Sequence, residues 1–273
     1  MTTALQTEAA PTPVARPPRA RATPQILALS RVEAVRLIRH PLLLLGVGLS
    51  ALLCVSVAGT DGPGQVAVLE GMGALPLAGG TLLAADLAGL RSHRDATTEL
   101  YDALPAPARI RIAAQLLALA GPTALAALLT AVTYLLVGAG DLVVNEQGLR
   151  HVPALSELVQ GPLMVAACGA AGALLATRAR SAIIAPVVLL ALLAVEVPLA
   201  VWGSPVAVRW ALPFVNAAQV VPDSWVPCAP GDMTPHCSFV TGYDTAGMAV
   251  HALYLIVVTA AAAVAALRSR SGE

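Results

Sequence analysis

Six long apolar stretches divide the chain, and the polar residues gather between them. Each stretch is close to the roughly 20 residues that a helix needs to cross the hydrocarbon core of a bilayer. Backbone groups in lipid need internal partners, and the ten-residue alternation of a membrane barrel is absent, so helices are expected. We predict an all-α integral membrane protein with six transmembrane helices, at about residues 42–58, 66–90, 112–138, 158–176, 182–202 and 246–267.

The chain before the first span divides into two parts. Residues 1–22 are rich in proline and poor in large apolar side chains, which is typical of a disordered tail. Thr23 and Pro24 then predict a helix start, with threonine as the cap and proline in the first turn. The six-helix domain therefore covers residues 23–273. Its first helix, over 25–40, is expected to lie in the membrane interface or to extend the first span.

The arginines predict an orientation. All 16 basic residues are arginine, and a cytoplasmic N-terminus would put 14 of them on the cytoplasmic side, leaving only Arg150 and Arg209 outside. Cytoplasmic loops of membrane proteins carry such an excess of positive charge. We therefore expect both termini in the cytoplasm of a multi-pass protein of the cytoplasmic membrane. The lysine-free composition, rich in Ala, Arg, Gly and Pro, is typical of a GC-rich bacterial genome.

Composition excludes several functions. The chain is 57% hydrophobic and 12% charged, whereas a soluble domain carries about 25% charged residues. The zero net charge gives no sign of a nucleic-acid partner. Without lysine the chain has no P-loop, and it has no HExxH, CxxC or GxSxG motif. We expect no catalytic site, no metal site and no cofactor of its own, and we expect each of the five histidines to be a loop or interface residue.

The loop between the second and third spans, residues 91–111, is the only long cytoplasmic loop between spans. A short helix is predicted there over residues 95–103, with Asp95 as its cap and Pro105 as its stop. The helix would carry a small apolar ridge made of Leu100, Tyr101 and Leu104. Such a ridge is suited to docking a soluble partner, and an ordinary solvated loop is the alternative.

At this loop the chain resembles the permeases of ABC-2-type exporters, the membrane subunits of ATP-binding-cassette transporters. In that family a Thr-Glu-Leu…Leu-Pro stretch follows the second span and a basic residue precedes the third, and TTELYDALPAPARIRIAAQLLAL is similar to it. LSRVEAVRLIRHPLLLL is similar to the family's interfacial helix, and the six-span plan with both ends inside also matches. The resemblance covers nearly the whole chain through loose motifs.

The resemblance implies a permease that is driven by a separate ATPase subunit, which binds the ATP. The loop would contain the coupling helix that receives the stroke of that ATPase, through Arg94, Asp95, Thr98, Glu99, Leu100, Tyr101, Leu104 and Pro105. One six-span chain is half of the family's membrane unit, so a homodimer or a sister permease is implied. The substrate stays open, and two other functions remain: an ion- or proton-coupled carrier, and a membrane subunit that anchors or assembles a partner.

Three carboxylates fall within the predicted spans. Glu70 lies near the outer end of the second span, Glu196 in the outer part of the fifth, and Asp86 near the inner end of the second. A charge in hydrocarbon costs at least about 2.5 kcal/mol, so such groups face a cavity or a partner. We expect Asp86 to be solvated at the interface. Glu70 and Glu196, at similar depth, are candidates for a substrate path or a proton relay, to which Asp86 would also belong.

The outer segment, residues 203–243, is the longest segment between the predicted spans. Its tryptophans and tyrosine are typical of the membrane interface, and residues 206–221 are apolar enough to form a short outer helix or lid, as in the resembled family. Cys228 and Cys237 lie in a turn-rich stretch of this segment. We predict a disulfide between them, with two free thiols as the alternative, and we expect Cys54 and Cys168 to be inert packing residues.

Overall fold

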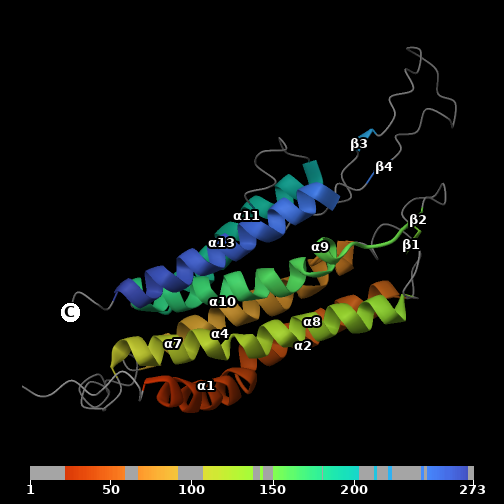
Figure 1. Cartoon of the computed structure of the whole chain (residues 1–273). Coiled ribbons are helices and arrows are strands. Elements are labelled where there is room, and N and C mark those ends of the chain that lie inside the picture. The colour runs from red at the N-terminus through yellow and green to blue at the C-terminus, as the bar shows by residue number, and fades with distance from the viewer. Residues whose placement is uncertain are drawn as a thin grey trace, which may run out of the picture.

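A bundle of helices forms the protein in this computed structural model (Figure 1). The structure describes residues 22–58, 67–91, 107–137, 142–143, 150–179, 181–202, 212–213, 221–222, 241–242 and 245–269. The helical elements are α1 (Ala22–Ile38), α2 (Pro41–Ala58), the 3₁₀ turn η2 (Met72–Ala74), α4 (Leu75–Gly89), α7 (Ala108–Ala118), α8 (Ala120–Leu136), α9 (Leu155–Leu158), α10 (Gln160–Arg178), α11 (Ile184–Trp202) and α13 (Thr245–Ser269).

Two short antiparallel ladders lie at one end of the bundle (Figure 1). In the first, β1 (Leu142–Val143) pairs with β2 (Arg150–His151). In the second, β3 (Val221–Pro222) pairs with β4 (Thr241–Gly242). Leu142 stands opposite His151, and Val221 stands opposite Gly242. Each ladder is only two residues long, so the helices determine the fold.

The helices are those of an integral membrane protein. Four of them are long and apolar enough to cross a bilayer, namely Met72–Gly89, Ala108–Leu136, Leu155–Arg178 and Ala246–Ser269. A fifth span is added if the bent pair α1 and α2 is counted as one. Many large apolar side chains face outward, for example Leu52, Leu135 and Leu253, which are each at least 60% exposed. A soluble surface rarely carries apolar patches of this extent, whereas lipid covers them without cost.

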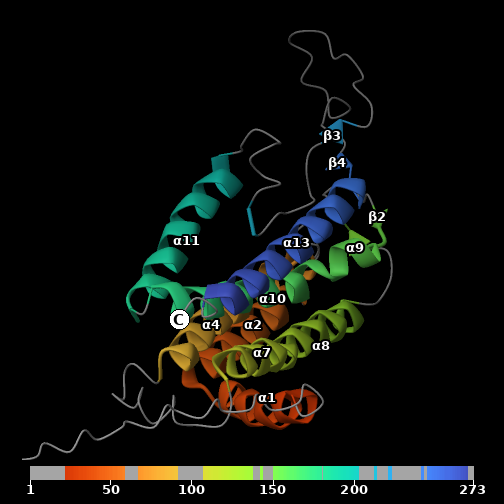
Figure 2. The ribbon, with the colours of Figure 1, turned by 60° about the vertical axis from the view of Figure 1, so that its left-hand side comes forward.

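The chain bends where α1 meets α2. The two helices make an angle of 61°, at the position where the sequence places Pro41. A proline cannot donate a backbone hydrogen bond, so it favours a new helix start. On the other side of the bundle, α11 has 19 residues, one more than the 18 of the span Met72–Gly89, and Figure 2 shows α11 diverging from α13.

The second predicted span is not one continuous helix. Residues 67–69 are helical, but the helix is interrupted before η2, and α4 begins only at Leu75. Gly71 has a φ of 127°, a backbone conformation that side chains other than glycine rarely adopt. The sequence indicated an uninterrupted apolar stretch over 66–90, so hydropathy located the span but not its break.

The centre of the bundle is the contact between α4 and α10, the most extensive helix pair in the described residues. Leu77 and Leu82 of α4 and Met164 and Val165 of α10 are almost completely buried. Gly172 lets the two helices approach closely, because a Cβ added there would overlap the carbonyl oxygen of Leu82. Small residues at helix contacts are typical of membrane bundles.

The described arginines of the transmembrane bundle gather at one end of it. This end, called the α1 end below, holds the last residues of α4, α10 and α13 and the first residues of α7 (Figure 1). Its arginines are Arg91, Arg109, Arg111, Arg178 and Arg268. The opposite end, called the α9 end, holds η2, α9 and the first turn of α13. The bundle therefore has one strongly positive end, as the arginine pattern of the sequence predicts.

Candidate functional site

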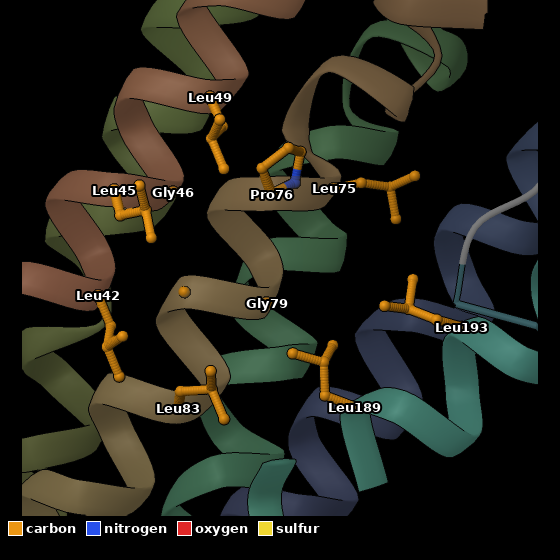
Figure 3. A pocket seen from close by; sticks show the side chains of 11 residues that line it. Leu42, Leu45, Gly46, Leu49, Leu75, Pro76, Gly79, Leu83, Leu189 and Leu193 are labelled. Carbon is orange, nitrogen blue, oxygen red and sulfur yellow. The ribbon is translucent and has the colours of Figure 1, made fainter. Parts of the chain in front are cut away.

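An apolar groove runs between α2, α4 and α11 (Figure 3). Its volume is about 300 Å³, at the lower end of the range of ligand pockets in proteins. The walls are made almost entirely of leucine: Leu42, Leu45 and Leu49 from α2, Leu75 and Leu83 from α4, and Leu189 and Leu193 from α11. The groove is therefore suited to an apolar chain or ring system.

The floor of the groove is formed by α4. Gly79 leaves space there because it has no side chain, and Gly80 lets α2 approach closely, because a Cβ at Gly80 would overlap the carbonyl oxygen of Leu42. Leu45 and Leu49 on its rim are 59% and 47% exposed, so the groove opens along the outer surface of the bundle. In a membrane this opening faces lipid, and a molecule that dissolves in the bilayer has lateral access to the groove.

Asp86 does not line the groove but lies on the same helix, α4, close in sequence to two residues that do. It follows Leu83 by three residues and Gly79 by seven, so the three residues share one face of α4. The sequence predicted that Asp86 is solvated, and this prediction is wrong, because the side chain is only 1% exposed. Neither carboxylate oxygen has a hydrogen-bond partner in the part of the chain that the structure describes. Such a group costs free energy unless it is neutral or meets a cation.

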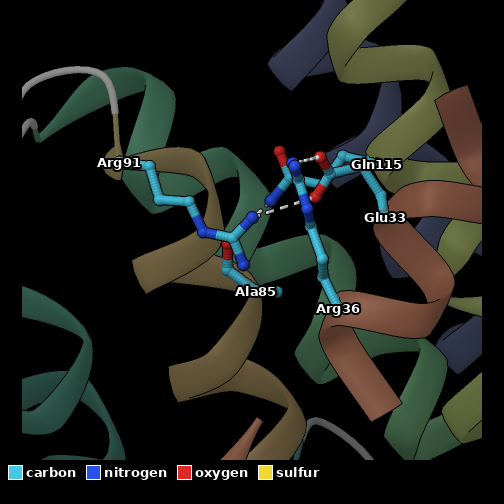
Figure 4. A network of polar contacts seen from close by, with 5 residues as sticks. All are labelled: Glu33, Arg36, Ala85, Arg91 and Gln115. Atoms are coloured by element: carbon cyan, nitrogen blue, oxygen red, sulfur yellow. Dashed lines mark hydrogen bonds and ion pairs between the residues drawn. The ribbon is translucent and has the colours of Figure 1, made fainter. Parts of the chain in front are cut away.

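A polar brace joins three helices at the α1 end (Figure 4). An Nη atom of Arg91 donates to Glu33 of α1 at 3.4 Å, and Arg36 donates to the other carboxylate oxygen of Glu33 at 3.0 Å. The Gln115 amide of α7 donates to the carbonyl oxygen of Ala85 on α4 at 2.7 Å. The polar brace is thus made of Glu33, Arg36, Arg91, Gln115 and the Ala85 carbonyl, and it ties α1 and α7 to the end of α4.

A second polar cluster lies inside the α9 end. The Gln160 amide nitrogen donates to the carbonyl oxygens of Ser156 and Met248, at 2.7 and 2.8 Å. These two bonds fix the orientation of the amide, so its oxygen faces Nδ1 of His251 at 2.8 Å. Nε2 of His251 lies 2.7 Å from the carbonyl oxygen of Leu212. Both ring nitrogens therefore face oxygen atoms, and which of the two nitrogens donates depends on the tautomer of the ring.

His251 corrects an expectation from the sequence. The sequence predicted that His251 is a loop or interface residue. In the structure it is 1% exposed and hydrogen-bonded inside the bundle. Its ring stacks on that of Tyr254, with the ring centroids 5.7 Å apart. One signal was present in the sequence: His251 is a single histidine within a long apolar span. A polar side chain inside a membrane span usually faces the bundle interior and a partner. Gln160 and Glu157, both buried, were also missed.

The other two predicted carboxylates are buried at separate places. Glu70 is 1% exposed and stands next to Gly71, whose backbone approaches Gly161 at the start of α10. Glu196 is 7% exposed and lies on α11. Nowhere in the described ranges do three or more His, Cys, Asp or Glu side chains form a group that could hold a metal ion.

Several predicted residues lie outside the described residues. They include the proposed coupling residues Arg94, Asp95, Thr98, Glu99, Leu100, Tyr101, Leu104 and Pro105. They also include Cys228 and Cys237, so the predicted disulfide stays a prediction. Cys54 and Cys168 are free cysteines, and Cys54 is buried.

The fold and these sites define a helical membrane protein with an apolar groove along its side and buried polar groups inside. Comparison with known proteins gives no match: no family model, no curated protein and no solved structure is significantly similar to this chain. Its function must therefore be argued from its own residues.

Proposed function

We propose that this chain is the membrane permease of an ABC-2-like exporter, in which it forms the substrate path and a separate ATPase subunit supplies the energy. In this proposal the six predicted spans cross the cytoplasmic membrane of a bacterium, and the α1 end faces the cytoplasm. The exporter is completed by a second permease, either another copy of this chain or a sister subunit.

The observation that carries the proposal is the polar brace at the α1 end. The proposed coupling helix, residues 95–103, belongs to the loop over residues 91–111, which begins at Arg91 and runs into α7 at Ala108. Arg91 contacts Glu33 of α1, and Gln115 of α7 contacts Ala85 of α4. A push on this segment would therefore reach α1, α4 and α7 together. A permease driven from outside the membrane needs contacts of this kind between its docking segment and its spans.

The groove supports the second part of the proposal. It lies between α2, α4 and α11, and α4 is also the helix that the polar brace holds. A movement of α4 would change the width of the groove along Leu83 and Leu189. An ATPase stroke at the α1 end would thus be coupled to an apolar path that opens toward lipid.

The coupling segment provides the test. Replacing Glu99 with Arg and Leu100 with Asp should abolish association with the ATPase subunit, because the change reverses a charge and removes an apolar contact from the predicted docking helix. The matched control is Glu146→Arg with Leu149→Asp, the same two kinds of change in the segment between the third and fourth predicted spans, which is predicted to be external. Co-purification of the two subunits from membranes measures association, and the amount of inserted permease measures folding.

The expected result is loss of association in the first variant only, with both variants inserted in normal amount. Full association and full export by the Glu99→Arg, Leu100→Asp variant would refute the coupling assignment. Equal loss in both variants would indicate a general defect in the permease and would also count against it.

The buried carboxylates favour a second candidate, an ion- or proton-coupled carrier. Glu70, Asp86 and Glu196 are all less than 8% exposed, and intramembrane carboxylates serve as proton relays in such carriers. The two functions differ in their energy source. Export that stops on collapse of the proton gradient while ATP is still present would favour the carrier, and export that stops on ATP depletion alone would favour the exporter.

A further inference from the structure

We infer that the groove between α2, α4 and α11, together with Asp86, is a binding site for a cationic amphiphile, a molecule with an apolar chain or ring system and one organic ammonium group. The apolar part would lie in the groove and the cation would meet Asp86. This inference rests on the proposed exporter function for its role as a substrate site, but the binding itself does not depend on that function.

The groove selects for an apolar body. Its lining consists of leucines, one proline and glycines, and no charged side chain belongs to it. Its rim is open along Leu45 and Leu49, so the ligand enters from the bilayer rather than from water. A purely polar substrate, such as a sugar chain, would find no hydrogen-bonding side chain on these walls.

Asp86 selects for a positive head group. It lies about one helical turn beyond Leu83, a rise of roughly 4.5 Å along α4. An amphiphile lying in the groove would bring an end group close to this carboxylate, and the side chains that cover Asp86 would have to move aside for the two to meet. The carboxylate is 1% exposed, and both of its oxygens lack a partner in the described part of the chain. A cation brought there by the ligand would remove the cost of an isolated buried charge.

In this inference the cation is organic and is brought by the ligand. A metal ion needs several oxygen ligands, and the described residues offer no group of three or more acidic, His or Cys side chains around it. Arg91 is the next basic residue of the chain after Asp86, and it bonds Glu33 instead. One carboxylate is sufficient for an ammonium group when the rest of the ligand is held by apolar contacts.

Direct binding tests the inference without the ATPase. The chain is reconstituted in nanodiscs of zwitterionic lipid, and equilibrium dialysis measures two ligands with the same tail, the cation decyltrimethylammonium and decyldimethylamine oxide, which has no net charge. Empty nanodiscs give the lipid background. We expect the protein to bind the ammonium compound about tenfold or more tightly than the amine oxide, as for a charge pair inside a dry site.

Three variants separate the two halves of the site. Asp86→Asn should lower the affinity for the ammonium compound to that of the amine oxide and leave the amine oxide unchanged. Gly79→Leu should weaken both ligands, because its side chain would start 3.4 Å from Leu189 and fill the groove. Gly48→Leu is the matched control, since a Cβ there meets nothing within 4 Å, and it should change neither affinity.

Equal affinity of the unchanged protein for the two ligands would overturn the inference. So would an Asp86→Asn variant that keeps the preference for the ammonium compound. If Asp86→Asn does not fold, the preference of the unchanged protein for the ammonium compound and the weaker binding of both ligands by Gly79→Leu decide the matter alone. Mass spectrometry of the co-purified lipids identifies the source of the ligand: displacement of an amine-bearing lipid by the ammonium probe indicates a membrane lipid, and probe binding without displacement indicates a soluble compound.

The inference and the proposed function fail separately. If the chain binds the ammonium compound through Asp86 but associates with no ATPase, the inferred binding site stands and the exporter function is refuted. If the chain associates with an ATPase but does not distinguish the two ligands, the exporter function stands and the inferred binding site is refuted.

Discussion

Gly172 of α10 packs directly against the carbonyl oxygen of Leu82 on α4. A methyl group at position 172 would overlap that oxygen. Replacing Gly172 with Ala should push the two central helices apart and lower the free energy of unfolding by about 1–3 kcal/mol, as for other overpacked sites. Gly48→Ala is the control, because a Cβ there has no neighbour within 4 Å. Unfolding in mixed micelles measures both, and equal stability of the two variants would contradict the close approach.

Gln160 makes three hydrogen bonds at distances of 2.7–2.8 Å inside the α9 end. Gln160→Leu keeps much of the volume but leaves Nδ1 of His251 without its acceptor, so stability should fall by about 1–3 kcal/mol. Thr259→Val on α13 is the control, because the Thr259 hydroxyl only bonds the Leu255 carbonyl one turn back. Unfolding in micelles again provides the measurement, and a stable Gln160→Leu variant would show that the cluster contributes nothing to folding.

The buried residues show how far the sequence could predict single positions. Asp86 was expected in solvent because it lies near a span end, and His251 was expected in a loop or interface because histidines are scattered. Both are buried because neighbouring helices cover them. Burial of one side chain depends on which helix faces it, and hydropathy along one chain does not contain that information. The carboxylate without a partner therefore became visible only in the folded protein.

At the scale of elements, the sequence indicated where apolar helices lie better than where they break. The bend between α1 and α2 coincides with Pro41, a residue with a known local effect. The interruption before η2 depends on Gly71 adopting a positive φ next to Gly161. Glycine permits this conformation but does not require it, and the second predicted span contains other glycines that remain helical, such as Gly79.

The pair of Glu33 and Arg91 is the link between α1 and α4 that can be tested by charge exchange. Both side chains are partly exposed, at 25% and 30%, so the pair should contribute at most about 1 kcal/mol to stability. Its loss should instead reduce the substrate-stimulated ATPase rate of the proposed complex, by about fivefold or more if the brace couples the subunits. Glu33→Arg removes the pair, and adding Arg91→Glu restores opposite charges.

The expected pattern is a large loss of stimulation in Glu33→Arg and a partial recovery in the exchanged double variant, with little change in thermal stability. A loss of stimulation that the second exchange does not repair would assign Glu33 a role apart from Arg91. Normal stimulation in Glu33→Arg would remove the polar brace from the coupling proposal.

At the scale of the whole molecule, the arginine pattern was the most informative part of the sequence. Arg91, Arg109, Arg178 and Arg268 are far apart in the chain and meet at one end of the bundle. This gathering follows from the alternating direction of successive spans, so one-dimensional charge counting was sufficient to predict it. Which helices pair at the centre was not predictable, because α4 and α10 are selected by the fit of small residues such as Gly172.

The orientation of the bundle is the last prediction. If the positive end faces the cytoplasm, as the charge asymmetry requires, reporters fused at Ala96 and after Glu273 should read as internal. Reporters at Gln147 and Gly231 should read as external, because each of these positions is separated from the positive end by an odd number of predicted spans. Paired alkaline phosphatase and fluorescent protein fusions measure the two compartments. A cytoplasmic signal at Gly231 would refute the six-span arrangement, and an external signal at Ala96 would also remove the proposed docking segment from the reach of any ATPase.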